Sequence, residues 1–246
     1  GEIMAKIYTV ISGKGGVGKS TFCVNIAFSL AEKGKKVLLI DGDITLRSLD
    51  LLLNLEENLV YDWSDIICNR CSKYAPILCY NDKIHLLPAP LEMPDNLDVS
   101  SFKELVVSFA SDYDFVFIDS PAGIGELQQM YAHASDQCIV VATPDNVSAR
   151  SACIAGTKLS EAGIKDENMY LVINRFDPRA VKSSKLLNID EVMDITYLKL
   201  LGVVPDDKRI MHTSVSDKEI PPRSKVKISF NNIAGRIMGK EIPLNL

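Results

Sequence analysis

The 246-residue sequence lacks several features that would assign it to a specialised class of protein. It has no run of about eighteen apolar residues, which a membrane-spanning helix requires. Residues 1–4 contain no basic-then-apolar segment, so we expect no signal peptide, and residues 1–3 before Met4 resemble a remnant of cloning. The net charge of −5 argues against a protein that coats DNA through charge alone.

Metal-ligating residues are also sparse, with only three histidines, far apart in the sequence. The six cysteines are scattered through apolar stretches, so reduced and mostly buried thiols are expected. Cys68 and Cys71 form the only close pair. A structural metal site would need a second such pair or two nearby histidines, so we interpret this pair as coincidental.

Short β-branched runs alternate with longer amphipathic segments along the whole chain, which predicts an α/β fold with a mostly parallel sheet. Continuous apolar runs indicate strands that are covered on both faces. The predicted strands are Lys6–Ser12, Val37–Ile40, Ile84–Leu87, Phe115–Ile118, Cys138–Ala142, Tyr170–Ile173 and Leu201–Val204. Predicted helices include Thr21–Lys33, Val99–Ala110 and Ser148–Ala162. No linker interrupts this pattern, so one domain spanning residues 4–246 is expected, with a three-layer sandwich built on seven or eight strands.

Polar and turn-forming residues follow these strands directly. In an open α/β sheet, ligands bind at the carboxyl ends of the strands, so this edge is the predicted binding edge. Strand ends also collect turn residues for purely structural reasons. The residues are Gly13, Asp41, Pro88, Asp119, Thr143, Asn174 and Pro205.

Residues 13–20 match the phosphate-loop pattern G-x-x-x-x-G-K-[ST] at every position. An apolar strand precedes the loop and an amphipathic helix follows it, as the motif requires. Backbone amides of the loop would surround phosphate oxygens, Lys19 would reach the β- and γ-phosphates, and Ser20 would ligate Mg²⁺. The predicted nucleotide-binding loop comprises Gly13, Gly15, Gly16, Val17, Gly18, Lys19, Ser20 and Thr21. The fold class is therefore predicted to be that of P-loop NTPases.

Three aspartates at strand ends are candidate catalytic and metal-binding residues. Asp119 ends a hydrophobic strand, the arrangement that holds Mg²⁺ beside a phosphate loop. Asp41 and Asp43 follow the second strand and could orient an attacking water and anchor the water shell of the metal. Asp43 could instead cap a following helix, Ile44–Leu53. We expect Ser20, Asp43 and Asp119 to be the metal-binding residues.

Lys14 is a second lysine, on the opposite limb of the loop from Lys19. The binding of phosphates by Lys19 does not require this second lysine. Residues 13–21 resemble the deviant phosphate loop of the MinD/ParA ATPases. The resemblance implies that Lys14 crosses a face-to-face homodimer and contacts the nucleotide of the partner, where other NTPases use an arginine finger. The alternative is a solvated loop lysine.

The resemblance covers essentially the whole chain. Residues 41–51 and 60–63 are similar to MinD-type rather than ParA-type proteins, and residues 119–123 resemble the second switch, in which Gly123 would approach the γ-phosphate. By the same resemblance, Asn174 and Arg175 match the position that binds the adenine edge, and Pro205 and Asp206 match the other wall of the base pocket. Asn174 could alternatively cap a turn.

The sequence departs from the MinD pattern at three places. MinD proteins usually end in an amphipathic membrane helix, whereas Lys225–Lys240 has apolar positions typical of a last packed helix and no such tail is seen after it. Thr45 and Ser48 stand where MinD proteins more often have Gly and Asn.

A locally basic C-terminal quarter could bind DNA, but interspersed acids favour a mixed solvated surface, so DNA binding is not expected. Its basic residues are Lys208, Arg209, Lys218, Arg223, Lys225 and Lys227.

The resemblance implies a slow Mg²⁺-dependent ATPase switch that binds ATP and ADP and forms a homodimer in the ATP state. It also implies an activating protein partner, a role in spatial positioning such as division-site selection, and a cytoplasmic location with possible peripheral contact at the inner face of the membrane. Alternatives are a ParA-like DNA-segregation or flagellar-placement ATPase. Rivals from other classes are a metabolic ATP-dependent ligase or kinase and a metal-cluster scaffold ATPase on the same fold.

Overall fold

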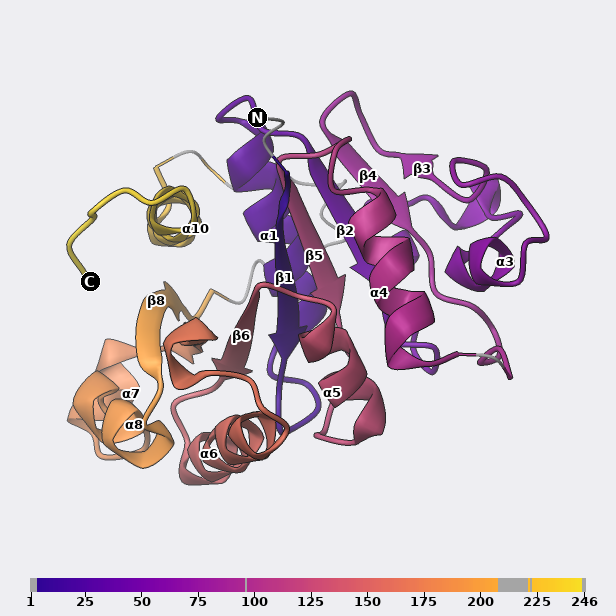
Figure 1. Cartoon of the computed structure of the whole chain (residues 1–246). Helices are drawn as coiled ribbons and strands as arrows, with labels where there is room; N and C mark the ends of the chain where they lie inside the picture. Colours follow the sequence, from indigo (N-terminus) through magenta and orange to yellow (C-terminus); the bar gives the residue numbers. More distant parts are fainter. Residues whose placement is uncertain (1–3, 96, 208–220, 222, 245–246) are drawn as a thin grey trace.

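An eight-stranded sheet runs through the computed structural model, which describes residues 4–95, 97–207, 221 and 223–244 (Figure 1). All neighbouring strands are parallel except β3, which pairs antiparallel with β4. Across the sheet, the order is β3 (Leu78–Cys79), β4 (Ile84–Leu87), β2 (Val37–Asp41), β5 (Phe115–Asp119), β1 (Lys6–Ile11), β6 (Gln137–Ala142), β7 (Met169–Phe176) and β8 (Lys199–Pro205). The predicted α/β fold with a mostly parallel sheet is confirmed.

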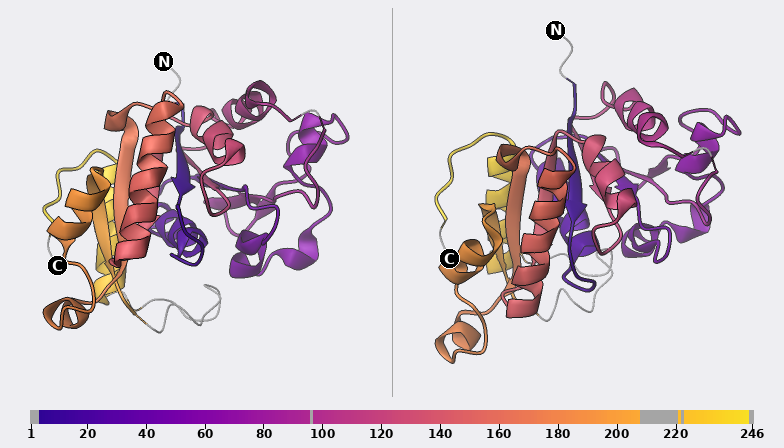
Figure 2. Two further views of the ribbon diagram at one scale, coloured as in Figure 1. Left: turned by 90° about the horizontal axis from the view of Figure 1, so that it is seen from below. Right: turned by 60° about the horizontal axis from the view of Figure 1, so that its bottom comes forward.

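Helices cover both faces of this sheet, as Figure 2 shows from two further directions. They are α1 (Lys19–Ala31), α2 (Ser48–Leu53), α3 (Trp63–Ile67), α4 (Val99–Ser108), α5 (Glu126–His133), α6 (Asn146–Glu161), α7 (Pro178–Lys182), α8 (Ile189–Thr196) and α10 (Lys225–Ile237). Short 3₁₀ turns occur at Glu56–Asn58 and Asp166–Asn168. No helix among the described residues is long and apolar enough to cross a membrane.

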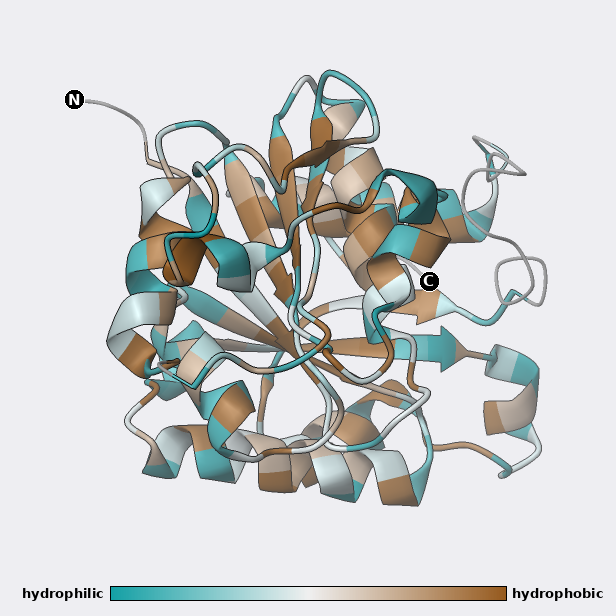
Figure 3. Cartoon of the chain, turned by 90° about the vertical axis from the view of Figure 1, so that its right-hand side faces the viewer, coloured by the Kyte–Doolittle hydropathy of each residue, from teal (hydrophilic) through white to brown (hydrophobic). Residues whose placement is uncertain are grey.

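Alternate residues of each strand belong to different hydrophobic layers, because successive side chains point to opposite faces of a sheet. On β1, Tyr8 and Val10 pack in the layer that contains residues of α1 and α10, whereas Ile7 and Ile11 pack in the layers under α4, α5 and α6. Figure 3 shows the hydrophobic colour concentrated in the central strands, with hydrophilic residues in loops and outer helix turns. The two buried faces explain why the strands are continuous apolar runs.

The last described helix packs as predicted for the final helix of the domain. Ser224 caps α10, since its hydroxyl accepts a hydrogen bond from the Lys227 amide at 3.2 Å. Phe230 and Ile233 are buried against the sheet, and Phe230 lies 5.9 Å from the ring of Phe22 on α1. Helix α10 is therefore part of the core. The basic residues Lys208, Arg209 and Lys218 lie outside the described residues, as do residues 1–3.

The predicted helix Ile44–Leu53 is wrong at its start, because α2 begins only at Ser48. One oxygen of the Asp43 carboxylate accepts hydrogen bonds from the amides of Thr45 and Leu46, both at 3.1 Å, and holds a turn there. Arg47 then adopts the left-handed conformation with φ of 43°. Asp43 therefore stabilises the turn before α2 rather than the first turn of the helix itself.

Two more differences from the predicted strands concern the length of β7 and the presence of β3. Strand β7 extends to Phe176, so Asn174 and Arg175 lie within it rather than after it. The register between β7 and β8 shifts between Ile173 and Phe176, and Arg175 has φ of 57°, so this segment bulges. Strand β3 was not predicted, since a two-residue strand is too short for a period-two pattern.

Candidate functional site

The loop between β1 and α1 presents unpaired hydrogen-bond donors and one buried positive charge. Gly18 caps α1 with φ of 96°, and no side chain caps the amides of the first turn. The Lys19 side chain belongs to a residue only 8% exposed, and no carboxylate in the described part of the chain lies within ion-pair distance of it. Because buried ammonium groups require a counter-charge, this arrangement favours an anion at the N-terminus of α1.

The glycine at the start of the loop is required by the close approach of helix α6. A Cβ atom added to Gly13 would lie 2.2 Å from the carbonyl oxygen of Ser151 and 2.6 Å from its carbonyl carbon. Both are backbone atoms, so no side-chain rotation could relieve the clash. Helix α6 is therefore held directly against the phosphate loop.

We expect Gly13→Ala to lower the free energy of unfolding by about 1–3 kcal/mol, the usual cost of overpacking. Gly15→Ala is the matched control, because its added Cβ would meet only Ala122 Cβ at 3.8 Å, an ordinary contact. Urea unfolding without nucleotide measures both. Equal losses of stability in the two variants would contradict the packing explanation.

Asp119 lies at the end of β5, where its carboxylate is buried near the positive charge of Lys19. The residue is fully buried, and neither carboxylate oxygen has a hydrogen-bond partner within the described residues. Burial raises the pKa of Asp119 to about 6, against the opposing effect of the positive charge on Lys19. Carboxylate and hydroxyl oxygens are ligands that Mg²⁺ accepts, so the residue fits the metal role predicted for it.

Removing the charge of Asp119 should remove one pH-dependent loss of stability. Its folded pKa of about 6 lies above the ordinary value of 3.8, so the folded state binds the extra proton and stability falls as the pH rises to about 6. Relative to the parent, Asp119→Asn should gain about 2 kcal/mol between roughly pH 4.5 and pH 8, from urea unfolding without nucleotide or Mg²⁺. Parallel pH curves for the two proteins would contradict this, and the exposed Asp82→Asn is the control.

Ser20, the first-turn hydroxyl predicted to hold the metal, is already in contact with helix α2. The Ser48 hydroxyl lies 2.9 Å from the Ser20 hydroxyl and hydrogen-bonds to it. In the sequence, Ser48 stands where MinD proteins more often have Asn. The structure shows that this departure places a small hydroxyl directly beside the candidate metal ligand.

The two aspartates after β2 differ in what their oxygens do. Asp41 accepts the Asp43 amide at 3.0 Å on one oxygen and the Leu49 amide at 3.1 Å on the other. Burial and the neighbouring carboxylate of Asp119 raise the pKa of Asp41 to about 8, although the two amide bonds oppose this. Asp43 uses only one oxygen for the turn before α2. The geometry therefore gives Asp41 a positioning role and leaves an oxygen of Asp43 available to water.

Lys14 has a different environment from Lys19. Its side chain is 46% exposed, and its ammonium lies 4.0 Å from a carboxylate oxygen of Asp145. Asp145 caps helix α6 by accepting the Ser148 amide at 2.9 Å, so its position is fixed. Lys14 therefore lies on the outer surface of the loop, where a second molecule could reach it.

A cavity of about 220 Å³ adjoins the N-terminus of α1 and brings together the predicted base-binding residues. Asn174 donates from its side-chain amide to the carbonyl oxygen of Val17 at 2.8 Å, which ties the bulge of β7 to the phosphate loop. Two aromatic residues of the lining, Phe22 and Phe230, were not predicted from the sequence. The cavity is lined by Gly18, Thr21, Phe22, Asn174, Arg175, Val204, Pro205, Asp206, Asp207 and Phe230.

Three further residues that the sequence analysis did not select hold the loops of the site in place. Gln128 donates to the carbonyl oxygens of Pro121 and Ala122, both at 3.2 Å, beside the positive-φ residue Gly123. The Tyr131 hydroxyl donates to the carbonyl of Gly42 at 3.0 Å, and the Trp63 indole donates to the carbonyl of Asp41 at 2.9 Å. The contacts of Tyr131 and Trp63 join residues 89 and 22 positions apart, so no sequence pattern indicates them.

The close cysteine pair lies away from this site, in the segment after α3. Cys68 and Cys71 are half-buried. Among the described residues they belong to no group of three or more His, Cys, Asp or Glu side chains placed to hold a metal.

A glycine-rich loop between a buried strand and an uncapped helix, with a buried lysine and strand-end carboxylates, is the phosphate-binding arrangement of P-loop NTPases. A model of the ParA family, described as "NUBPL iron-transfer P-loop NTPase", matches residues 3–238. The chain therefore belongs to the ParA family of P-loop NTPases, as the resemblance in its sequence predicted.

Its relatives include MinD proteins. The chain is 34% identical to the septum site-determining protein MinD of Bacillus subtilis, over 99% of this chain and 92% of the relative. Among solved structures, the MinD cell division protein of Aquifex aeolicus has a TM-score of 0.87 and 29% identity, covering 98% of this chain and all of that one. MinD of Pyrococcus horikoshii, solved in complex with Mg-ADP, has a TM-score of 0.81 and 26% identity, over 95% and 96% of the chains.

Proposed function

We propose that this protein is a Mg²⁺-dependent ATPase switch of the MinD type, slow in hydrolysis and dimeric in its ATP state. The observation that carries the proposal is the contrast between its two loop lysines. Lys19 is buried beside the uncapped helix, whereas Lys14 is half exposed on the outer surface of the loop. A lysine in that place is suited to the phosphates of a second molecule, and the MinD relatives support this reading.

The residues of the chain divide the chemistry between them in this proposal. Lys19 and the loop amides bind the phosphates, and Asp43 orients the attacking water through its remaining oxygen. Ser20 and Asp119 would hold Mg²⁺, with Asp43 near its water shell. The metal would supply charge stabilisation to the phosphates. Lys14 of the partner subunit would stabilise the charge that develops during hydrolysis.

The walls of the base cavity complete the proposed nucleotide site. Asn174 and Arg175 on one side, and Pro205 and Asp206 on the other, line the space that adjoins Gly18. We assign this cavity to adenine because it continues from the phosphate loop and its Asn174 amide is fixed by Val17. Gly123 would approach the γ-phosphate, since it carries no side chain and adopts φ of 102°.

The process we propose is selection of the cell-division site. Curated relatives are named septum site-determining proteins, and a solved structure with a TM-score of 0.87 is a MinC:MinD complex of Aquifex aeolicus at 31% identity. A protein partner of the MinC kind is therefore proposed, together with a cytoplasmic location and peripheral membrane contact. DNA segregation or flagellar placement by a ParA-like mechanism remains the alternative process.

Dimerisation tests the switch directly. Size-exclusion chromatography with light scattering should give twice the monomer mass with ATP and Mg²⁺ when hydrolysis is slow, and the monomer mass with ADP. Only the switch requires this dependence on the third phosphate. A monomer in both nucleotides, with phosphate release that depends on a small-molecule substrate, would instead support a metabolic ligase or kinase.

A further inference from the structure

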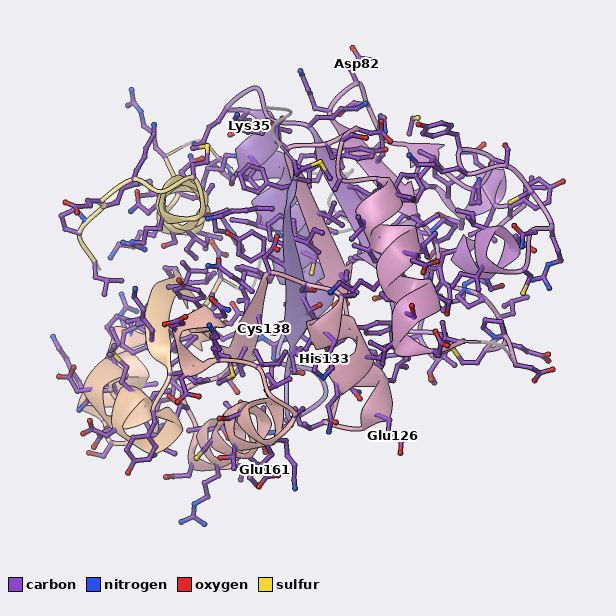
Figure 4. All side chains as sticks on the ribbon, in the orientation of Figure 1. Lys35, Asp82, Glu126, His133, Cys138 and Glu161 are labelled. Atoms are coloured by element: carbon purple, nitrogen blue, oxygen red, sulfur yellow. The ribbon has the colours of Figure 1, made fainter. Side chains whose placement is uncertain are left out.

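A second cavity, of about 620 Å³, lies at the opposite ends of the strands from the phosphate loop. Lys6, Gln137 and Lys199 begin β1, β6 and β8, so the cavity lies at the amino ends of these strands, beside the C-terminal end of α10. Figure 4 shows the two edges: Lys35 and Asp82 precede β2 and β4 at one, and Glu126 opens α5 after β5 at the other. Because β1 alone spans about 20 Å, this cavity is separate from the nucleotide site.

The lining of this cavity is positive although the chain as a whole is negative. It contains Lys6, Lys199, Arg236 and Lys240 against one carboxylate, that of Glu241. None of these four cations forms an ion pair with a described residue. The three lysines are exposed, and the ammonium of Lys199 lies 5.5 Å from the ring centroid of Tyr170. Their charges are therefore available to an anion that enters the cavity.

The guanidinium of Arg236 shows this imbalance most clearly. Its three nitrogens donate to the carbonyl oxygens of Ile242, Leu201 and Pro243 at 2.8–2.9 Å. These neutral acceptors fix the guanidinium and the wall formed by residues 242–243, but they do not neutralise the charge. Burial lowers the pKa of Arg236, as expected for a cation held without an anion.

Tyr8 of β1 also lines the cavity. The ring of Tyr8 is stacked on Phe117, with centroids 5.2 Å apart, and the residue is only 2% exposed. Tyr8 lines the cavity, yet its hydroxyl makes no hydrogen bond within the described residues. The hydroxyl is not among the buried unpaired atoms of the described residues, so solvent reaches it, and it is free to donate to a ligand oxygen.

We propose that this cavity binds a phosphomonoester carried on an apolar body. Lys199 and Lys240 would contact the phosphate oxygens, and the Tyr8 hydroxyl would donate to one of them. The apolar part would contact the aliphatic residues of the lining, and the volume is in the range of small-molecule sites rather than of a bare phosphate. These residues are Leu200, Leu201, Ile237, Ile242 and Pro243. The same chemistry occurs in a free aryl or alkyl phosphate and in the headgroup of phosphatidic acid.

Phenyl phosphate is the probe for the free form. Titrated into the ¹⁵N-labelled full chain, it should shift the amide signals of Leu201 and Ile237. Lys199→Gln and Lys240→Gln should each weaken binding about tenfold, and Tyr8→Phe several-fold, since each removes one charged or neutral hydrogen bond. Lys185→Gln, an exposed lysine outside the lining, is the matched control and should leave the affinity unchanged.

Vesicles distinguish the lipid source. Sedimentation with phosphatidic acid vesicles but not with phosphatidylcholine vesicles, lost in Lys199→Gln and Lys240→Gln, would assign the site to a lipid headgroup. Shifts with phenyl phosphate and no sedimentation would assign it to a free phosphate ester. The proposal is overturned if phenyl phosphate shifts only amides of residues 13–21 and sedimentation is absent, or if the three cavity variants bind as tightly as Lys185→Gln.

Discussion

Lys19→Ala should abolish ATP binding while the fold remains intact. The ammonium of Lys19 is buried beside the uncapped N-terminus of α1 and has no ion pair within the described chain. It therefore contributes to the binding of phosphates rather than to an internal salt bridge. The loss of two charge-assisted hydrogen bonds should weaken binding by roughly two orders of magnitude or more, measured by calorimetry with ATP and Mg²⁺.

Lys19→Met separates the charge from the packing of the side chain. Methionine fills a similar volume without a charge, so it should lose ATP binding to the same extent as alanine. Urea unfolding without nucleotide should show little change in stability in Lys19→Met, since removal of a buried cation offsets the loss of its attraction to Asp119. If Lys19→Met retained normal ATP affinity, the lysine would not be the phosphate ligand.

Lys14→Ala should give the opposite pattern, with ATP bound normally by the monomer but hydrolysis and dimerisation lost. Lys14 lies on the outer surface of the loop, 46% exposed and 4.0 Å from Asp145. Its removal leaves the inner phosphate contacts in place. A trans-acting cation is worth at least about 10³ in rate, so steady-state phosphate release should fall by about that factor while the ATP affinity of the monomer stays unchanged.

Lys158→Ala is a close control for this variant. Lys158 has a similarly exposed side chain, at 50%, and its ammonium lies 2.8 Å from the carboxylate of Glu161. It shares the surface character of Lys14 but lies at the far end of α6, so its removal should change neither hydrolysis nor dimerisation. A Lys14→Ala protein that hydrolysed ATP as a monomer at the parental rate would overturn the trans role.

Features carried by consecutive residues could be predicted from the sequence. The phosphate loop combines a glycine pattern, a preceding apolar strand and a following helix, and all three are local. Asp119 was placed at the binding edge because its strand is a short apolar run and parallel strands end at the same edge. The alternation of strands and helices similarly predicted the layered fold.

Features made by contacts between distant residues could not be predicted. The start of α2 depends on the Asp43 carboxylate, which holds a turn instead of a helix, and on the left-handed Arg47. The bulge that places Asn174 against Val17 depends on the pairing of β7 with β8. The contact between Ser48 and Ser20 joins residues 28 positions apart, and hydroxyl pairs leave no periodic pattern.

The unpaired ammonium of Lys19 and the unpaired carboxylate oxygens of Asp119 also affect how the protein withstands heat. Neither group has an ion pair or hydrogen bond in the described chain, although the charge of Lys19 acts on Asp119, so a ligand that brings phosphates and a metal acts as part of the folded structure. At a concentration of one hundred times its dissociation constant, such a ligand adds about 2.7 kcal/mol to the free energy of unfolding. The melting temperature of this protein should therefore rise and fall with the nucleotide pool around it.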